Sequence, residues 1–366
     1  MTSKRRNDGG APRNPDGPGA SRHVPVMLTE VVAALALRDG ETYIDATFGA
    51  GGYSRAILDA APCNVLALDR DPSAVRDAVA VCQDFPNRLT VVQSRFATLD
   101  DVARLYLSTN STPETPSIFT PPDGVVFDIG VSSMQLDDAE RGFSFQSDGP
   151  LDMRMGHASG ALSEGAGPSA AEVVNEEPEE RLADIFYQLG EERRSRAVAA
   201  AIVRRRVDKP FERTADLAAL VSSVPGTHRP DGRHPATRTF QALRIWVNDE
   251  LGELARGLAA AEAVLKPGGR LVVVTFHSLE DRIVKRFLAQ RCGKTAGVSR
   301  YLPMGVTKSE PSFRLVNSKS LSPSEQETVG NPRARSARLR QAERTTAAAW
   351  GSEGIADDLP EVLRDR

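Results

Sequence analysis

The stretch "DATFGAGGYS", Asp45 to Ser54, decides the fold class. Apolar residues precede it and a helical pattern follows it, which predicts a loop between a strand and a helix. Its glycines let the backbone approach a ligand closely, because glycine carries no Cβ atom. Such loops hold nucleoside triphosphates, dinucleotides or S-adenosylmethionine, and other parts of the sequence must distinguish among these three.

Short apolar segments alternate with helical patterns along the chain. Strands are expected at 42–45, 64–69, 88–94, 124–130 and 270–276. Helices are expected at 54–60, 71–82 and 248–265. This alternation predicts an α/β fold with a parallel, doubly wound sheet. Residues 170–222 contain helical patterns only, which indicates a helical insertion in that fold.

The composition is typical of a globular protein of the cytosol. The chain has 366 residues, 40% of them hydrophobic, enough for one large domain with an insertion or for two domains. Its cysteines, Cys63, Cys82 and Cys292, have no metal-binding or redox spacing. Neither a signal-peptide pattern nor an apolar run of about 18 residues occurs. We therefore expect a cytoplasmic protein that is not exported and does not span a membrane.

The net charge of −3 conceals a strong asymmetry. Residues 1–190 are net acidic, whereas 191–245 and 281–345 are net basic. The pattern is typical of a protein that docks a polyanion, although solvated helix surfaces would produce it too. The arginines that could contact phosphates are Arg193, Arg196, Arg204 and Arg205, followed near the end of the chain by Arg333, Arg335, Arg338 and Arg340.

Acidic residues at strand ends narrow the ligand of the glycine loop. The loop lacks the Gly-Lys-Ser/Thr ending that a triphosphate requires. Asp69 ends the next strand, 20 residues after Gly49, where a carboxylate can accept both hydroxyls of a ribose. Asp45 would repel a pyrophosphate but could pair with the amino group of S-adenosylmethionine. Asp128 ends the fourth strand at the edge where ligands bind. These acids favour S-adenosylmethionine, unless Asp45 and Asp128 merely cap turns.

Seven segments read as long motifs of one family. They are "HVPVML" (23–28), "DATFGAGGYS", "FDIGVSSMQLDDAERGFSF" (127–145), "DGPLDMRM" (148–155), "HPATRTFQALRIWVN" (234–248), "TFHSLEDRIVKRF" (275–287) and "NPRARSARLR" (331–340). Together they closely resemble the bacterial 16S ribosomal RNA cytosine-N4 methyltransferase family, from about residue 23 to residue 344. The resemblance implies a Rossmann-like, S-adenosylmethionine-dependent methyltransferase fold.

The resemblance also implies a domain order, in which the helical insertion recognises the substrate. The expected segments are a disordered arm at 1–22, the first part of the methyltransferase domain at 23–140, the inserted helical RNA-recognition domain at 141–238, the second part of the methyltransferase domain at 239–345 and a mobile tail at 346–366.

The family's cofactor-binding positions carry over residue by residue. They fall on Gly51, Gly52, Tyr53, Asp69, Phe96, Asp128 and Gln135. In this assignment Asp69 holds the ribose, Phe96 packs on the adenine, and Asp128 lies beside the methionine moiety. The family often has histidine where this chain has Tyr53, so only a backbone contact carries over at that position. No cluster of residues in the sequence calls for a metal.

The implied reaction is methylation of the N4 amine of cytidine 1402 in 16S rRNA, in the decoding region of the 30S ribosomal subunit. Asp128 and the carbonyls that follow it are the candidates to accept a hydrogen bond from this amine. Phe143 and Phe145 could stack on the flipped base or could anchor the insertion to the core. Family members can form homodimers, which we carry over as an expectation.

Two other functions stay open at the level of sequence. One is methylation of DNA or of a protein side chain, and the DNA version is disfavoured because the Pro-Pro-aromatic motif of DNA amino-methyltransferases is absent. The other is a ribosome-binding assembly factor with an inactive pocket. The intact glycine loop and the acids Asp69 and Asp128 disfavour that second alternative.

Overall fold

The computed structural model describes residues 25–108, 119–156, 167–228, 232–294, 309–352 and 354–364. The arm expected at 1–22 lies outside the described residues. Among the described residues, no helix combines the length and hydrophobicity that crossing a bilayer requires.

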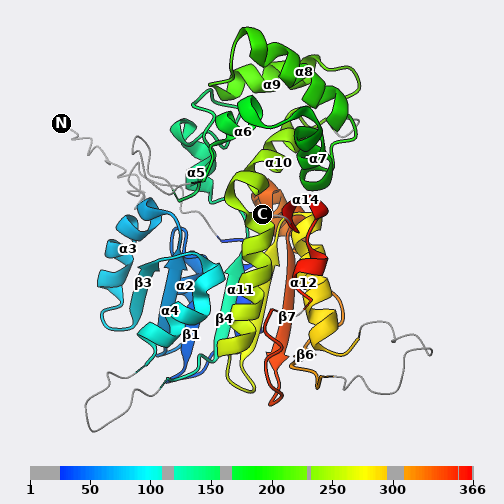
Figure 1. Ribbon diagram of the computed structural model, residues 1–366. Helices are drawn as coiled ribbons and strands as arrows, with labels where there is room; N and C mark the ends of the chain where they lie inside the picture. The colour runs from blue at the N-terminus through cyan, green and yellow to red at the C-terminus, as the bar shows by residue number, and fades with distance from the viewer. Residues whose placement is uncertain are drawn as a thin grey trace, which may run out of the picture.

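A seven-stranded sheet with the order β3-β2-β1-β4-β5-β7-β6 forms the centre of the molecule (Figure 1). Its strands are β1 (Thr42–Asp45), β2 (Asn64–Asp69), β3 (Leu89–Gln93), β4 (Gly124–Asp128), β5 (Arg270–Thr275), β6 (Phe313–Leu315) and β7 (Arg338–Arg344). Strands β1 to β5 are parallel, and β7 runs antiparallel between β5 and β6. The order reverses between β1 and β4, so a crevice is expected beyond their carboxyl ends.

The sheet is buried on both faces, as its apolar strands predicted. Along β4, Val125 and Phe127 belong to one hydrophobic cluster, whereas Val126 belongs to the other. Helices α1 (Leu28–Leu35), α2 (Gly52–Ala60) and α3 (Pro72–Asp84) contribute to the cluster of Val126. Helices α4 (Leu99–Tyr106), α11 (Glu250–Val264) and α12 (Ser278–Arg291) contribute to the cluster of Phe127. This double cover confirms the predicted α/β class.

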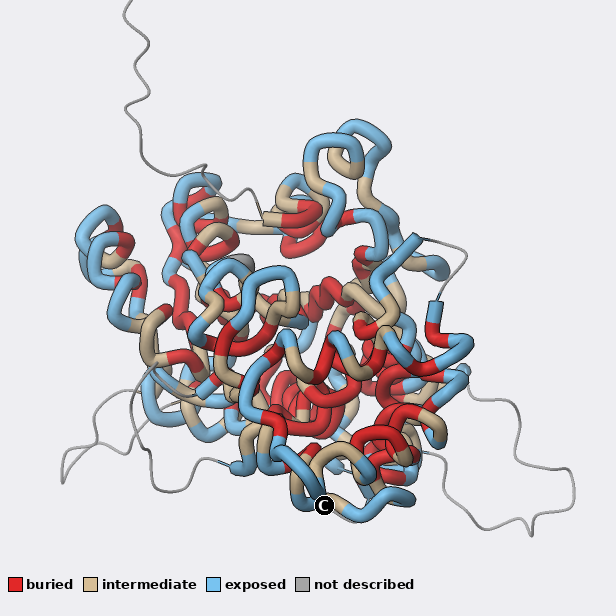
Figure 2. The backbone as a smooth tube through the Cα atoms, turned by 90° about the horizontal axis from the view of Figure 1, so that it is seen from above, coloured by how far each residue is buried: buried red, intermediate tan, exposed pale blue. Residues whose placement is uncertain are grey.

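The segment between β4 and β5 builds a helical lobe above the sheet (Figure 1). Its helices are α5 (Ser133–Asp137), α6 (Ala170–Glu176), α7 (Glu179–Gly190), α8 (Ser195–Asp208), α9 (Thr214–Ser223) and α10 (Thr237–Asn248). Helix α7 packs against both α8 and α10. The lobe and one face of the sheet share a hydrophobic cluster, and Figure 2 shows buried chain running through the interior. The domain boundaries stay a prediction.

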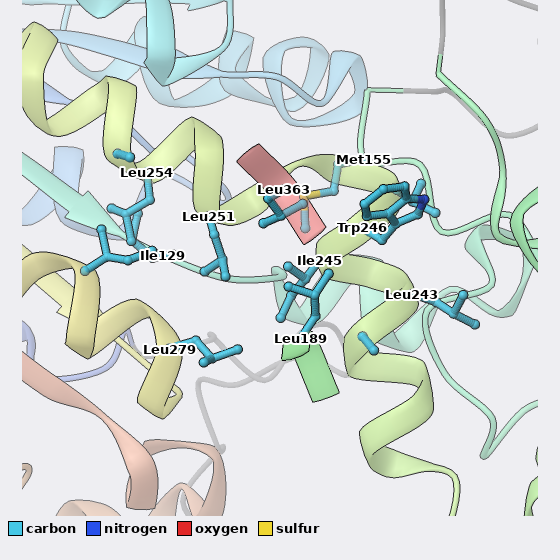
Figure 3. Close-up of a cluster of buried hydrophobic side chains, with 14 of the residues drawn as sticks. Ile129, Met155, Leu189, Leu243, Ile245, Trp246, Leu251, Leu254, Leu279 and Leu363 are labelled. Carbon is cyan, nitrogen blue, oxygen red and sulfur yellow. The ribbon is translucent and has the colours of Figure 1, made fainter. Parts of the chain in front are cut away.

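The junction between lobe and sheet is apolar (Figure 3). Side chains of five helices meet there beside Ile129, namely Leu189 of α7, Leu243 and Trp246 of α10, Leu251 and Leu254 of α11, Leu279 of α12 and Leu363 of α14 (Glu361–Arg364). Helix α10 ends at Asn248, and the next residue, Asp249, has a φ of 51° that turns the chain into α11. The two helices therefore link the lobe directly to the sheet.

The end of the chain differs from the expected mobile tail. Its described residues include α14, whose Val362 and Leu363 are buried. The Val362 N–H donates to Oε1 of Gln188 on α7 at 3.0 Å. Asp358 accepts from Arg286 of α12 at 3.4 Å. The polar composition of the segment concealed these two apolar residues. Together with Asp358, they attach the segment to α7 of the lobe and to α12 beside the sheet.

Strands β6 and β7 were not expected from the sequence. Strand β7 reads "RLRQAER", and its arginines suggested a basic surface cluster rather than a strand. The structure buries Leu339 and Ala342 and pairs β7 with both β5 and β6. The elements of the C-terminal part also include α13 (Glu325–Gly330).

We predict that the C-terminal segment stabilises the fold through its apolar contacts. Leu363 is 4% exposed, so Leu363→Ala should lower the free energy of unfolding by roughly 2 kcal/mol. Thermal and urea unfolding of the full chain would measure the change. Glu361→Ala, at an exposed position of the same helix, is the matched control and should stay within about 0.5 kcal/mol of the parent. Equal midpoints for the two variants would contradict a stabilising role.

Candidate cofactor and substrate site

A cavity of about 750 Å³ opens at the carboxyl end of the sheet. The glycine turn and the ends of β2 and β4 line one part of it, and α10 together with the β5–α12 connection lines another. Six of the seven predicted cofactor residues line this one cavity: Gly52, Tyr53, Asp69, Phe96, Asp128 and Gln135. The structure thus brings these residues together, while their contact with a cofactor stays a prediction.

The seventh predicted residue, Gly51, shapes the turn instead of lining the cavity. Its φ is 77°, and its N–H donates to the carbonyl of Phe48 at 2.7 Å. A Cβ atom at Gly51 would lie 2.7 Å from the Phe48 ring. Its neighbours Gly49 and Ala50 line the cavity in its place. Position 51 therefore needs glycine for the backbone geometry, which the motif alone does not distinguish from ligand contact.

Asp69 is fixed by the turn that it faces. Its Oδ2 accepts the N–H of Gly49 at 2.8 Å, and its Oδ1 accepts the N–H of Asp71 at 2.8 Å. Burial raises the pKa of this carboxyl, while the two backbone N–H groups oppose that effect. A half-buried carboxylate at the end of β2 has the placement that the ribose assignment requires.

Asp45 does not have the ligand role that its position suggested. It is fully buried, and its carboxylate accepts from the hydroxyl of Ser54 at 2.7 Å and from the N–H of Thr47 at 3.2 Å. Burial raises its pKa to about 6. Asp45 therefore links the start of the glycine turn to Ser54 of α2. This arrangement agrees with the alternative in which Asp45 caps the turn and does not contact the ligand.

One carboxylate oxygen of Asp128 has no hydrogen-bond partner in the described part of the chain. Its backbone N–H donates to Oγ1 of Thr47 at 2.7 Å. Its Oδ1 is shielded from solvent and has no hydrogen-bond partner among the described residues. Burial, together with the charges of Asp45 and Glu280, raises the pKa of Asp128 to about 8. A buried acceptor without a partner is costly, so this atom fits a donor from a ligand.

Tyr53 and Phe96 complete the cofactor part of the wall. The Tyr53 hydroxyl donates to the carbonyl of Val26, so the side chain is committed to the protein and only its backbone and ring remain for a ligand. Phe96 is half-buried and meets Phe127 edge-on, with ring centroids 5.7 Å apart. One part of the Phe96 ring is thus fixed by the core while another part faces the cavity, as packing on a flat base requires.

Gln135 acts through Asp71. Its Nε2 donates to Oδ2 of Asp71 at 2.9 Å, and its Oε1 accepts the N–H of Ser132 at 3.0 Å. Arg141 donates to the same Asp71 oxygen at 2.8 Å. Burial would raise the pKa of Asp71, but the hydrogen bonds from Ser73 and Gln135 and the Arg141 charge hold it below its usual value. Sequence reasoning missed Asp71 and Arg141, although Asp71-Pro72 is a recognisable helix start.

A second polar group stands behind the α10 part of the cavity. Arg244 donates from Nε and Nη2 to the two carboxylate oxygens of Glu250, at 2.7 and 2.8 Å. Glu280 is fully buried, and its Oε1 lies 2.8 Å from Nε2 of His277. Ligand atoms of Glu250, His277 and Glu280 lie within 4.8 Å of one another. Because Arg244 already occupies Glu250, we describe this group as an ion-pair network.

The two aromatic residues expected to stack on the base already pack against other protein groups. Phe143 is buried. Phe145 stacks on His234 with centroids 4.6 Å apart and meets Phe240 edge-on at 4.9 Å. Both line the cavity as well, so they connect the lobe to the cavity wall.

The predicted phosphate-binding arginines differ in availability. Arg205 stacks on Phe211 at 4.3 Å, and Arg340 forms a bidentate pair with Asp281 at 2.7 and 2.9 Å. Their guanidinium groups are therefore engaged within the fold. The exposed members of the two groups are Arg193, Arg196, Arg204, Arg333 and Arg335, and among these Arg333 pairs with Asp137 at 3.2 Å.

A Rossmann-like sheet with an antiparallel strand inserted before its last strand is the architecture of S-adenosylmethionine-dependent methyltransferases. Asp69 and Asp128 end β2 and β4 at the carboxyl edge of the sheet, where ligands of open α/β sheets bind. The chain is a methyltransferase of this class.

Comparison with known proteins narrows the class. The model of the MraW methylase family matches residues 20–345. A ribosomal RNA small subunit methyltransferase H from Hyphomonas neptunium is 54% identical over 338 residues, which cover 92% of each chain. A protein of the same name from Xanthobacter autotrophicus is 54% identical over 342 residues, which cover 93% of each chain. Another from Methylorubrum extorquens is 56% identical over 331 residues, which cover 90% of this chain and 89% of the relative. The chain belongs to the MraW methylase family, with S-adenosylmethionine as its cofactor.

We predict that Gly52 is required for cofactor binding. A Cβ atom there would lie 2.1 Å from Cγ of Pro25, which also lines the cavity. Gly52→Ala should weaken S-adenosylmethionine binding roughly 10- to 100-fold, because such overpacking costs about 1–3 kcal/mol. Titration calorimetry would measure the affinity. Gly330→Ala, where a Cβ atom meets open space, is the control. Unchanged affinity in Gly52→Ala would contradict the prediction.

We also predict that cofactor binding releases a proton from Asp128. With a pKa of about 8, this carboxyl is mostly protonated at pH 7, and a cationic ligand favours its anionic form. The affinity should therefore rise with pH, up to about tenfold per unit between pH 6 and 7.5. Calorimetry in buffers of different ionisation enthalpy would count the protons. Asp128→Asn should abolish the release, and the exposed Asp101→Asn should retain it. The absence of proton release from the parent protein would contradict the assignment.

Proposed function

We propose that the chain methylates the N4 amine of cytidine 1402 in 16S rRNA, with the 30S ribosomal subunit as substrate. Methylation of small-subunit rRNA follows from the family and its named relatives. The observation that supports the atom is the unsatisfied Oδ1 of Asp128, at the end of β4 and in the wall of the cavity. Because ribosomal subunits are cytoplasmic, we place the activity in the cytoplasm.

The chemistry requires an acceptor beside the amine. The lone pair of a cytosine N4 amine is delocalised into the ring, which makes the amine a poor nucleophile. A carboxylate that accepts a hydrogen bond from one N–H of the amine returns electron density to the nitrogen. Holding that nitrogen within about 3 Å of the electrophilic methyl group supplies much of the rate. When bound, S-adenosylmethionine supplies the electrophilic methyl group.

Asp128 suits this role because of its environment. Its raised pKa, caused first by burial, matches a group that must take up a proton from the methylated amine near neutral pH. The proton would pass to a carboxylate oxygen of Asp128, and solvent at the cavity mouth would receive it later. Asp128 is assigned both to the methionine moiety of the cofactor and to the N4 amine. One carboxylate can serve both, because each of its two oxygens can face one of these groups.

The charge distribution supports separate roles for the cavity and the surface. The cavity wall carries Asp69, Asp128 and, behind it, Glu280, which disfavour a phosphate but favour a cationic cofactor. Exposed arginines such as Arg193 and Arg196 lie on the lobe, where contact with RNA phosphates gives affinity and orientation without reading sequence.

The test is methyl transfer from labelled S-adenosylmethionine to 30S subunits from a strain that lacks this gene. The RNA is then digested and the modified nucleoside is identified and mapped. We expect N4-methylcytidine at position 1402, with Asp128→Asn reducing the rate by about 10²- to 10⁴-fold. Asp101→Asn, outside the cavity wall, is the matched control. Cofactor binding without transfer to 30S subunits, or equal transfer to duplex DNA, would overturn the proposal.

A further inference from the structure

Arg244 of α10 lines the cavity, and only part of its guanidinium group is paired within the described residues. Its Nε and Nη2 form a fork on the two oxygens of Glu250, at 2.7 and 2.8 Å. Glu250 is buried and does not line the cavity, whereas Arg244 does. The remaining nitrogen, Nη1, lies on the guanidinium edge that faces away from this fork and carries two N–H donors. Among the described residues we find no partner for Nη1.

The position of Arg244 is fixed by contacts on two sides. Asn248 donates from Nδ2 to the Arg244 carbonyl at 2.9 Å and to the Met153 carbonyl at 2.7 Å. The side chain is 17% exposed and Glu250 holds its far edge. The guanidinium is thus a rigid donor rather than a mobile surface charge, so little conformational entropy is lost when a ligand binds to it.

The charge of the buried Glu280 acts on both Asp128 and Arg244. Burial, followed by the charges of Asp45 and Glu280, raises the pKa of Asp128. Burial alone would lower the pKa of Arg244, but the charge of Glu250 and then that of Glu280 raise it. Both residues line one cavity. A ligand there meets an acceptor at Asp128 and a donor at Arg244.

The local charge selects the kind of group that Arg244 can bind. The carboxylate of Glu250 pairs with the guanidinium and neutralises it, and the charge of Glu280 acts on it as well. An anionic phosphate would be repelled by these acids. A neutral base with one donor and an adjacent acceptor fits the pair of groups.

We propose that Arg244 determines base specificity by donating from Nη1 to N3 of the target cytosine. The proposal rests on the proposed function, which places the N4 amine at Asp128. The neighbouring ring atom of cytosine, N3, is an acceptor, so it pairs with a guanidinium N–H. Uracil has an N–H donor at that ring position and a carbonyl in place of the amine. It would set donor against donor at Arg244 and acceptor against acceptor at Asp128, and be rejected.

The experiment is a cycle of one protein change and one RNA change. The substrate is the 30S subunit reconstituted with either cytidine or 3-deazacytidine at position 1402, where the analogue keeps the amine but replaces N3 with C–H. The protein is the parent or Arg244→Gln. We expect each single change to lower kcat/KM by roughly 10- to 100-fold, and the combination to fall little further. The cycle removes the altered reactivity of the analogue, because that effect is common to both proteins.

Multiplicative losses would overturn the proposal, since they would mean that Arg244 acts on a phosphate or only on the fold. Because Arg244→Gln leaves Glu250 buried without its partner, Arg244→Gln with Glu250→Gln is measured as well and should show the same pattern. Calorimetric affinity for S-adenosylmethionine should stay within about twofold in both. Arg256→Gln, which breaks an ion pair with Asp249 outside the cavity wall, should retain full discrimination.

These outcomes separate the two proposals. If the parent protein forms no N4-methylcytidine on the unmodified subunit, the proposed function fails and the cycle has no reference rate. If the parent forms it and the losses multiply, only the role of Arg244 fails.

Discussion

The buried ion pair between Arg141 and Asp71 joins the parts of the molecule that form the site. Its side chains are 7% and 5% exposed, and Nη1 of Arg141 lies 2.8 Å from Oδ2 of Asp71. Asp71 also begins α3 by accepting the N–H of Ser73. Arg141 donates further to the carbonyl of Met155 at 2.9 Å. Removing either partner would leave a buried charge uncompensated, at a cost of about 3–5 kcal/mol. The cofactor side of the sheet and the entry to the lobe therefore depend on one contact.

The site accumulates acids for a chemical reason. Burial makes Asp128 costly to ionise, and the nearby charges of Asp45 and Glu280 add to this cost, while burial also raises the pKa of Asp45. A cationic cofactor offsets part of it when bound. The fold stabilises the rest of the group with directed bonds, because Ser54 donates to Asp45 and the backbone N–H of Phe276 donates to Glu280 at 2.7 Å. Asp128 keeps one shielded carboxylate oxygen without a partner among the described residues, at the end of β4 beside the cavity.

Much of the sheet was predictable, because buried parallel strands are short apolar runs bounded by turns. The strands predicted from β1 to β5 agree with the structure to within two residues at their ends, and the glycine loop lies where the motif placed it. The sequence could not reveal the Arg141–Asp71 pair, since 70 residues separate the two and neither stands out from other charged residues. Strand β7 and helix α14 were not predicted because their few apolar residues lie among many polar ones, so neither segment shows the apolar pattern of a buried element. Gln135 lines the cavity, and its bonds to Ser132 and Asp71 become visible only in three dimensions.

The two parts of the cavity depend on different kinds of information. The cofactor part comes from local sequence, because a strand end, a glycine turn and an acid after the next strand bring their groups together within one βαβ unit. The residues of the substrate part do not come from one short sequence motif. Arg244, Glu250 and Glu280 come from α10, α11 and α12, and they meet only because apolar side chains such as Leu251 and Leu279 pack the lobe against the sheet. A change at that apolar junction would therefore move the Arg244 donor relative to Asp128 without touching the cofactor. If Arg244 selects the base as proposed, base selection and cofactor binding are separable properties of one cavity, and the lobe junction controls the first.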